Sequence, residues 1–389
     1  MKTGLKCLLL TILIGYSRTQ AQEKEIKWEL SGYVKDLRTL FFVDGMDSVV
    51  TDNLLHNRLN FQWYAHENLT ARIELRNRIF YGELVRQIPR FGRLPDINND
   101  FFDLSFNLID DRSLVFNTTI DRIYLEYNKN NWEVRVGRQR INWGINLAWN
   151  PNDVFNAYSF FDFDYEERPG SDAIRIKKYT GIASSMELAA NITDDMDEWV
   201  VAGLWKMNKW NYDFQFLAGV ARQDIVLGSG WAGSIKDAGF KGEFTWFKPL
   251  NDHEEGAFET FLVSLSADYS FVNGLYLNGS FLINTGLESA AGLEGFNTLN
   301  FDRLDTKRVL PFPYATFLQT SYPVNPLLTA AFSWMTFPGE ASFFVNPTLT
   351  ASVFSNFDLD LIGQIFYEKK EKGYEANSPA FFIRIKWSF

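Results

Sequence analysis

The sequence predicts an all-β fold: a transmembrane, antiparallel, up-and-down β-barrel of about eighteen strands with long external loops. Three observations predict it. Apolar and polar residues alternate with period two along much of the chain of 389 residues. Aromatic residues make up 16% of the chain, yet mean hydropathy is slightly negative at −0.18. After the first 21 residues, no run approaches the ~20 apolar residues that a membrane helix needs. Alternating strands satisfy all three, because only every second residue faces lipid.

The last nine residues carry the clearest alternation. Large apolar side chains share one face, whereas Arg384 and Lys386 lie on the other. A soluble edge strand would rarely expose such a face, because it would template aggregation, but lipid accepts it. The ending resembles the terminal strand of bacterial outer-membrane barrels, which implies that Trp387 and Phe389 belong to the signal read by the barrel assembly machinery. The apolar face consists of Phe381, Ile383, Ile385, Trp387 and Phe389.

The amino terminus reads as a secretory signal peptide over residues 1–21. Lys2 and Lys6 precede a short apolar core, and small residues lie near Ala21. Residues 22–389 then form a single barrel domain. The one cysteine, Cys7, lies in the leader, so the mature chain has no disulfide and depends on backbone pairing and packing.

The net charge excludes one class of partner. The whole chain carries −10, and removing the three basic residues of the leader gives −10 − 3 = −13. A chain this acidic has no general basic surface for nucleic acid. The expected partners are outer-membrane lipid and lipopolysaccharide, the barrel assembly machinery and small polar solutes, in the outer membrane of a bacterial cell. No cofactor and no metal is expected, and the sequence leaves open whether barrels associate as homo-oligomers.

Strands follow one another along the mature chain with few interruptions. The first strand is predicted at 26–34. A clear hairpin, with one apolar and one polar face, follows at 58–63 and 69–76. Residues 82–117 lack sustained alternation and must lie outside the membrane or in the lumen, since unpaired backbone cannot face lipid. Further strands are predicted at 123–127, 132–136, 172–179, 183–191, 198–206, 211–222, 229–235, 239–247, 258–270, 275–284, 313–321, 327–335, 344–353, 358–368 and 379–389.

Connection lengths support an even number of strands. With both termini in the periplasm, every second connection should be short, and the long ones, at 82–118, 142–171 and 285–312, all fall on the opposite side. The strands at 172–179 and 229–235 carry the weakest pattern. Without them, sixteen strands remain as the alternative.

The most distinctive stretch runs from 136 to 170. It contains Gly-Arg-Gln at 137–139, Trp-Gly at 143–144 and Asn-Pro-Asn-Asp at 150–153. Here the chain resembles the porin-like superfamily of Gram-negative outer-membrane barrels that includes the alginate-export and phosphate-selective porins. The resemblance implies a channel fold and a motif-bearing loop, but the acidic run from Asp162 to Glu167 departs from a simple anion pore. The loop-motif residues are Trp143, Gly144, Asn150, Pro151 and Asp153.

Arginines concentrate on one wall of this acidic chain. By parity, five arginines on neighbouring strands point into the lumen, and others lie near its external end. They form either a basic stripe that favours anionic or hydroxyl-rich solutes or a set of braces paired with Glu74, Glu126 and Glu133, and the two roles are compatible. The predicted pore-lining residues are Arg58, Arg72, Arg76, Arg122, Arg135, Arg138, Arg140, Glu74 and Glu126, with Arg78, Arg168 and Arg175 near the external end.

Other chemistry has thin support. Segment 82–118 offers oxygen ligands at Asp96, Asn98, Asp100 and Asp103, with Asp110 and Asp111 further on, but it lacks the glycine and distal glutamate of a calcium loop. Aromatics between Phe155 and Tyr165 suit packing within a folded loop better than stacking on sugars. No catalytic motif accompanies the three histidines, so an enzyme is not expected.

The function that these observations favour is passive diffusion of small polar or anionic solutes. Selection would come from pore diameter and lumen charge, with 82–118 or 142–171 folding inward as the constriction, because the wall alone would leave a wide lumen. The alternatives are a non-conducting barrel that serves as an interaction platform and an export pore for acidic polysaccharide.

Overall fold

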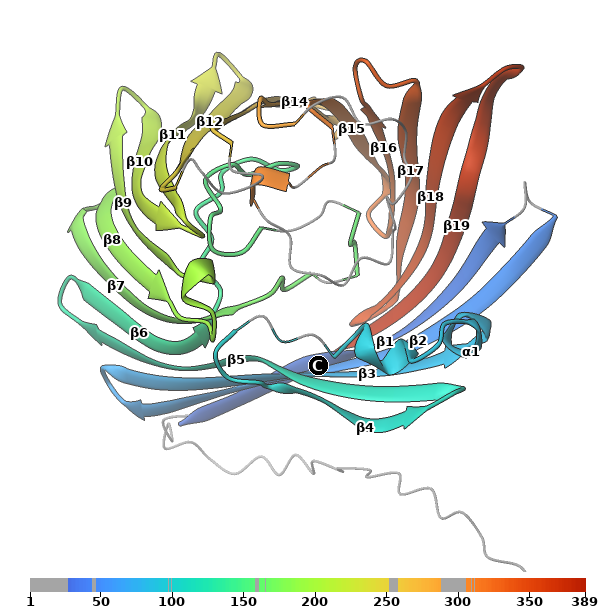
Figure 1. Cartoon of the computed structure of the whole chain (residues 1–389), viewed down its shortest axis with the longest axis horizontal. Coiled ribbons are helices and arrows are strands. Elements are labelled where there is room, and N and C mark those ends of the chain that lie inside the picture. Colours follow the sequence, from blue (N-terminus) through green and yellow to red (C-terminus); the bar gives the residue numbers. More distant parts are fainter. Residues whose placement is uncertain are drawn as a thin grey trace, which may run out of the picture.

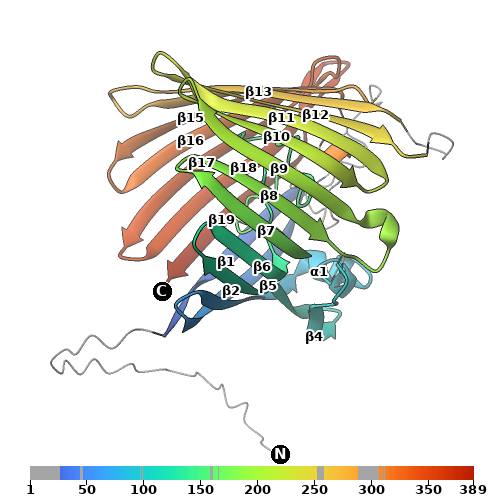
Figure 2. The same cartoon turned by 90° about the vertical axis from the view of Figure 1, so that its left-hand side faces the viewer.

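The chain forms a closed antiparallel β-barrel, seen in a computed structural model (Figures 1 and 2). The structure describes residues 27–43, 47–96, 98, 100–157, 161–164, 166–251, 258–287, 306–308, 310 and 312–389. The predicted signal peptide lies outside these residues. The predicted fold class is confirmed.

Nineteen strands make one sheet in the described part of the chain. They are β1 Trp28–Val43, β2 Ser48–His66, β3 Leu69–Gly82, β4 Ser105–Asp111, β5 Leu114–Lys129, β6 Trp132–Gln139, β7 Ser171–Gly181, β8 Ser184–Asn191, β9 Val200–Lys209, β10 Tyr212–Ala221, β11 Asp224–Ile235, β12 Ala238–Pro249, β13 Thr260–Ser270, β14 Tyr276–Asn284, β15 Tyr314–Asn325, β16 Leu328–Thr336, β17 Ser342–Phe354, β18 Phe357–Lys370 and β19 Gly373–Ser388. The helical segments are α1 Glu83–Gln87 and the short 3-10 turns η2 Phe91–Arg93, η3 Met196–Glu198 and η4 Thr306–Arg308.

Eighteen of these strands close the ring. Each pairs with its neighbour, and β19 pairs with β1 to complete the barrel. The exception is β4, which lies beside residues 114–119 of β5, while β6 pairs with residues 123–129 of the same strand. The eighteen predicted strands are therefore confirmed, including the two with the weakest pattern, and the sixteen-strand alternative is wrong.

The structure extends several elements beyond the predicted ranges. β1 runs on to Val43 and β2 begins at Ser48, so most of residues 35–57, which the predicted strands leave out, are also strand. β4 and the start of β5 fall within the segment 82–117, where the expected absence of strands is wrong. Its side chains do not alternate strictly, because the register of β4 shifts between Asn107 and Ile109.

Side-chain exposure follows period two around the wall. On β19, Phe381, Ile383 and Ile385 are 41%, 43% and 46% exposed, whereas the intervening Phe382 is 8% exposed. The outward apolar rows need a lipid surround. The inward rows mix polar and charged side chains with a buried apolar cluster that includes Leu204, Phe317 and Phe344. In the described residues, no helix is long and apolar enough to cross a membrane.

Both ends of the described chain lie at the rim with the short turns. Gly32 and Phe389 exchange two backbone hydrogen bonds of 2.9 Å, which join the first strand to the last residue. Seven of the eight connections on this side contain two residues, and the eighth spans 271–275. This matches the predicted sidedness, with short periplasmic turns and longer loops at the other rim.

Candidate functional site: the inward loop and the charged wall

The described residues between β6 and β7, 140–157, 161–164 and 166–170, form a loop that lies inside the barrel (Figure 1), and we call it the inward loop. Its successive residues contact inward side chains of strands far around the ring. Near its start, the Trp143 indole N–H donates to Glu187 on β8 at 2.7 Å. The Gln215 amide on β10 donates to the Trp143 carbonyl at 2.8 Å. The loop is thus fastened to the wall rather than extended outward.

Glu243 on β12 organises the part of the loop that carries the motif. It is fully buried, and its carboxylate accepts backbone N–H groups from Ile145, from Asn146 at 3.0 Å and from Asn152 at 2.9 Å. A carboxylate that receives three N–H groups is a strong anchor. Position 144 favours glycine for a steric reason, because a Cβ atom there would overlap the Asn150 side chain.

Asn146 and Asn152 extend this anchorage to neighbouring strands. The Asn146 amide donates to Ser264 on β13 at 3.0 Å and accepts from Ser266 at 2.6 Å. Thr245 donates to Asn152 at 2.8 Å. The motif therefore serves to dock the loop onto β12 and β13, a role that sequence spacing alone does not reveal.

Aromatic residues hold the next part of the loop to the opposite wall. Trp149 packs edge-on against Phe317 of β15, with ring centroids 6.2 Å apart. Phe161 meets Phe344 of β17 at 4.9 Å, and Gln364 of β18 donates to the Phe161 carbonyl at 2.9 Å. The expectation that these aromatics pack within a folded loop is met for Phe155 and Phe161, which are 0% and 5% exposed. Tyr158, Phe160 and Tyr165 lie outside the described residues.

The acidic run of the inward loop contacts the wall where β19, β1 and β2 lie side by side. The Lys35 ammonium, fully buried, lies 2.8 Å from the Asp164 carboxylate and donates to its carbonyl at 2.7 Å. His56 Nδ1 lies 3.3 Å from the same carboxylate. Lys386 pairs with Glu166 at 2.7 Å. The acids that depart from a simple anion pore are therefore partners of wall cations.

The ionisation of these loop acids follows from that pairing. Burial alone would raise the pKa of Asp164, but the Lys35 ammonium and the hydrogen bond with His56 outweigh it and hold the pKa well below its usual range. Burial would also raise the pKa of Glu166, but the Lys35 ammonium lowers it, and the net effect is a lowered pKa. Both carboxylates remain charged at neutral pH, so the attachment of the loop is ionic.

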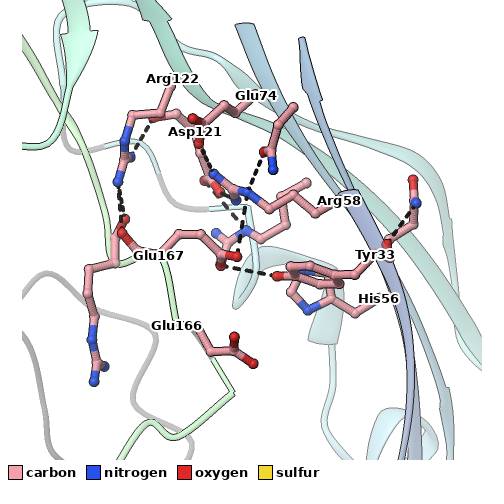
Figure 3. Close-up of polar contacts among 12 residues, drawn as sticks. Tyr33, His56, Arg58, Glu74, Asp121, Arg122, Glu166 and Glu167 are labelled. Carbon is pink, nitrogen blue, oxygen red and sulfur yellow. Dashed lines mark hydrogen bonds and ion pairs between the residues drawn. The ribbon is translucent and has the colours of Figure 1, made fainter. Parts of the chain in front are cut away.

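A second charged group, the wall network, consists of Arg58, Glu74, Asp121 and Arg122, which Figure 3 labels, together with Arg76. Arg58 is fully buried and pairs with both Glu74 and Asp121. Arg76 lies 3.5 Å from Asp121. Arg122 donates to loop carbonyls at 167 and 168 at 2.9 and 2.7 Å, which joins the network to the inward loop.

Asp121 is an inward-facing residue that period-two alternation does not predict. With Arg122 inward, strict alternation would place Asp121 outward. The pairing of β3 with β5 shifts between Glu74 and Leu75, where Glu74 faces Arg122 and Leu75 faces Ile120. This bulge turns both Asp121 and Arg122 inward, and they are 3% and 5% exposed. A charged residue directly before an inward arginine was the available signal, because lipid would reject an acid.

The remaining predicted residues also lie on this wall. Arg72 reaches Glu74 at 2.5 Å, and Arg135 pairs with Glu126 and with Glu133, the latter at 3.2 Å. Arg138 pairs with Asp172 at 2.8 Å, while Arg140 stands at the start of the inward loop near Asp153. The bracing partners that the sequence suggested are therefore present.

The candidate calcium acids do not converge. Asp100 lies 3.8 Å from Arg138, and Asp103 accepts from the backbone of Ser105 at 3.2 Å. Among the residues that the structure describes, no group of three or more acids, histidines or cysteines could hold a metal ion. In the segment between β3 and β5, Val85 and Phe91 pack on Phe80 and Val115. Further along, the Phe102 N–H donates to Asp172 of β7 at 2.9 Å, and Arg138 of β6 donates to the Phe102 carbonyl at 2.6 Å.

Asp153 gives the inward loop an expected dependence on pH. It is 1% exposed, and burial, opposed by Arg140 and by the Trp143 N–H, raises its pKa from 3.8 to about 8. Between pH 3.8 and about pH 8, the Asp153 carboxyl is deprotonated in the unfolded chain but keeps its proton in the folded chain. Stability should therefore fall as pH rises, by about 1.4 kcal/mol per pH unit, and level off above pH 8.

Urea unfolding in detergent micelles between pH 4 and pH 9 measures this slope. Asp153→Asn should remove the component, whereas Asp194→Asn, at an exposed loop position, should leave it unchanged. An Asp153→Asn variant with the same slope as the wild type would contradict the assignment.

The fold and this interior define a class of protein: a closed eighteen-stranded antiparallel barrel with a charged interior and a loop folded into it. No protein-family model matches the chain, and no curated protein matches it. Solved structures do match. OccK11 (OpdR) of Pseudomonas aeruginosa has a TM-score of 0.57 at 9% identity, covering 93% of this chain and 96% of that one.

Two further structures agree over the same extent. OccAB4 of Acinetobacter baumannii has a TM-score of 0.55 at 11% identity, covering 95% of this chain and 100% of that one. The outer membrane protein opdK of P. aeruginosa has a TM-score of 0.54 at 9% identity, covering 93% of this chain and 98% of that one. At these identities the likeness is one of fold. No comparison tests the finer resemblance to alginate-export and phosphate-selective porins, which stays a prediction.

Proposed function

We propose that this protein is an outer-membrane channel for passive diffusion of small polar or anionic solutes, with the inward loop as its constriction. The observation that carries the proposal is the attachment of one loop to strands around the whole ring, from Trp143 at β8 to Glu166 at β19. A wall of eighteen strands encloses a wide space, so a loop fixed across it sets the passage. An outer membrane protein of the same fold supports the location.

The charged interior supports a preference for anions. On the β2, β3 and β5 walls, Arg58, Arg72 and Arg76 stand beside Glu74 and Asp121, and the pairs brace the wall. Arg72 is the most accessible of these arginines, with its side chain 38% exposed. Accessible guanidinium groups attract anionic groups of a passing solute even while they hold a structural partner. Bracing and selection then reside in the same residues.

Reversal potential across a planar bilayer tests the selectivity. In a salt gradient, the wild-type channel should show anion preference, and Arg72→Gln with Arg76→Gln should reduce it, because two lumen cations are lost. Lys369→Gln, at an exposed strand end, serves as the control and should behave as the wild type. A channel without anion preference, unchanged by the double substitution, would refute the selective role.

Single-channel recording separates the channel from the platform. Steady openings, together with liposome swelling in neutral and charged sugars, would establish diffusion. A folded barrel that stays silent would favour the interaction platform. Uptake of acidic oligosaccharide in place of small sugars would favour the polysaccharide pore.

A further inference from the structure

The outer face of β13 to β16 carries a groove that the channel function does not use. Its volume is about 490 Å³. The floor consists of small residues, Ala267 and Gly279, which are directly paired, and Thr320 two strands on. A Cβ at Gly279 would meet only the Leu318 side chain, at 3.4 Å, so the floor is open rather than filled by backbone.

Large apolar side chains form the walls of this groove. They are 37% to 46% exposed and belong to the outward rows of their strands, as do the small floor residues, while Asp268, Asn278 and Gln319 of the lining stand at the positions between. Pairing across the sheet forms two adjacent rows in which large side chains flank the small ones: Tyr269, Leu277, Thr320 and Phe332 in one, and Ala267, Gly279, Leu318 and Trp334 in the other. The wall residues are Tyr269, Leu277, Leu318, Phe332 and Trp334.

We propose that this groove binds one acyl chain of a phospholipid in the periplasmic leaflet. The groove lies on the surface that faces lipid, and no charged residue belongs to its two outward rows. Its volume is that of a small-molecule pocket, which is typically ~300–1,000 Å³. A second copy of the chain would instead need a broad face of about 800 Å² per partner.

The position along the strands selects the leaflet. Ala267 lies three residues before the end of β13, and Gly279 lies three residues after the start of β14. The turn 271–275 joins these strands at the rim with the short connections, which is the periplasmic rim of an outer-membrane barrel. The acyl chain bound in this groove therefore belongs to a lipid of the periplasmic, phospholipid leaflet.

Filling the floor tests the site. Gly279→Leu places a side chain in the groove with an ordinary van der Waals contact. The matched control is Gly203→Leu on β9, also on an outward row, where a Cβ would meet only carbonyl oxygens at 3.6 and 3.9 Å. Native mass spectrometry with added palmitoyl-oleoyl phosphatidylethanolamine should show one retained lipid on the wild type and the control. Gly279→Leu should bind it about tenfold more weakly, which corresponds to about 1.4 kcal/mol.

Two further measurements keep the proposal open to refutation. Thr320→Leu fills the same floor from β15 and replaces Gly279→Leu if that variant fails to fold. Phospholipid brominated along the acyl chain should quench Trp334, measured as the difference from Trp334→Phe, and quenching should fall in the filled variants. Equal lipid retention in wild type and filled variants would overturn the site. So would disulfide-linked dimers of Leu318→Cys in membranes, since Cys7 is the one native cysteine and lies in the predicted leader.

Discussion

Replacing Glu243 by Ala is expected to detach the inward loop and increase single-channel conductance. The carboxylate is fully buried and accepts the N–H groups of Ile145, Asn146 and Asn152. Each buried N–H left without an acceptor costs ~1–3 kcal/mol, so the folded loop should lose about 3 kcal/mol or more. A detached loop no longer fixes the width of the passage. Recordings in planar bilayers would show larger and noisier openings.

Two variants sharpen this test. Glu243→Gln retains one acceptor oxygen, and because one oxygen serves both Ile145 and Asn146, its effect should be intermediate. Glu375→Ala, at an exposed position of β19, removes a carboxylate without touching the loop and should leave conductance unchanged. Wild-type conductance in Glu243→Ala, in a barrel that folds normally, would show that the inward loop does not constrict the channel.

Asp121→Asn is expected to be among the most destabilising substitutions in the wall. Asp121 is 3% exposed, pairs with Arg58 and lies 3.5 Å from Arg76. Removing one partner of a buried ionic group leaves an uncompensated charge, which typically costs ~3–5 kcal/mol. The urea midpoint of refolding in detergent micelles should drop accordingly. The lost negative charge should also raise anion preference in reversal-potential measurements.

A double-mutant cycle with Arg58→Met distinguishes pairing from general disruption. The two residues contact each other, so their coupling should be ~0.5–3 kcal/mol rather than zero. Asp36→Asn breaks an exposed pair with Arg38, whose side chain is 58% exposed, and should cost at most about 1 kcal/mol. If Asp121→Asn costs no more than Asp36→Asn, the wall network does not stabilise the barrel.

The strand order and the inward direction of most arginines were predictable from the sequence. Period-two alternation assigns Arg58, Arg72 and Arg76 to the lumen because lipid and water sort side chains residue by residue. The pairs with Glu74 were proposed on the same ground and are present. The inward direction of Asp121 was not predictable, because a β-bulge shifts the alternation by one residue and composition does not reveal one extra residue.

The partners of the inward loop could not be predicted in the same way. Trp143, Asp153 and Asp164 stood out as residue types, but Glu243 lies 90 positions from Asp153 and carries no local motif. Lys35 of β1 meets Asp164 only because the inward loop crosses the interior from β6 to reach the first strand. Contacts of this kind depend on where the loop lies in three dimensions.

The sequence by itself determined the barrel, the sidedness of its connections and the gathering of arginines on one inner wall, because each depends on which solvent a residue meets at its own position along a strand. Tertiary structure alone decided which loop enters the lumen, where it is anchored and how its acids are neutralised. The physical reason is that alternation is a local property, whereas a buried carboxylate or ammonium is stabilised by whichever partner the closed ring brings within hydrogen-bond distance.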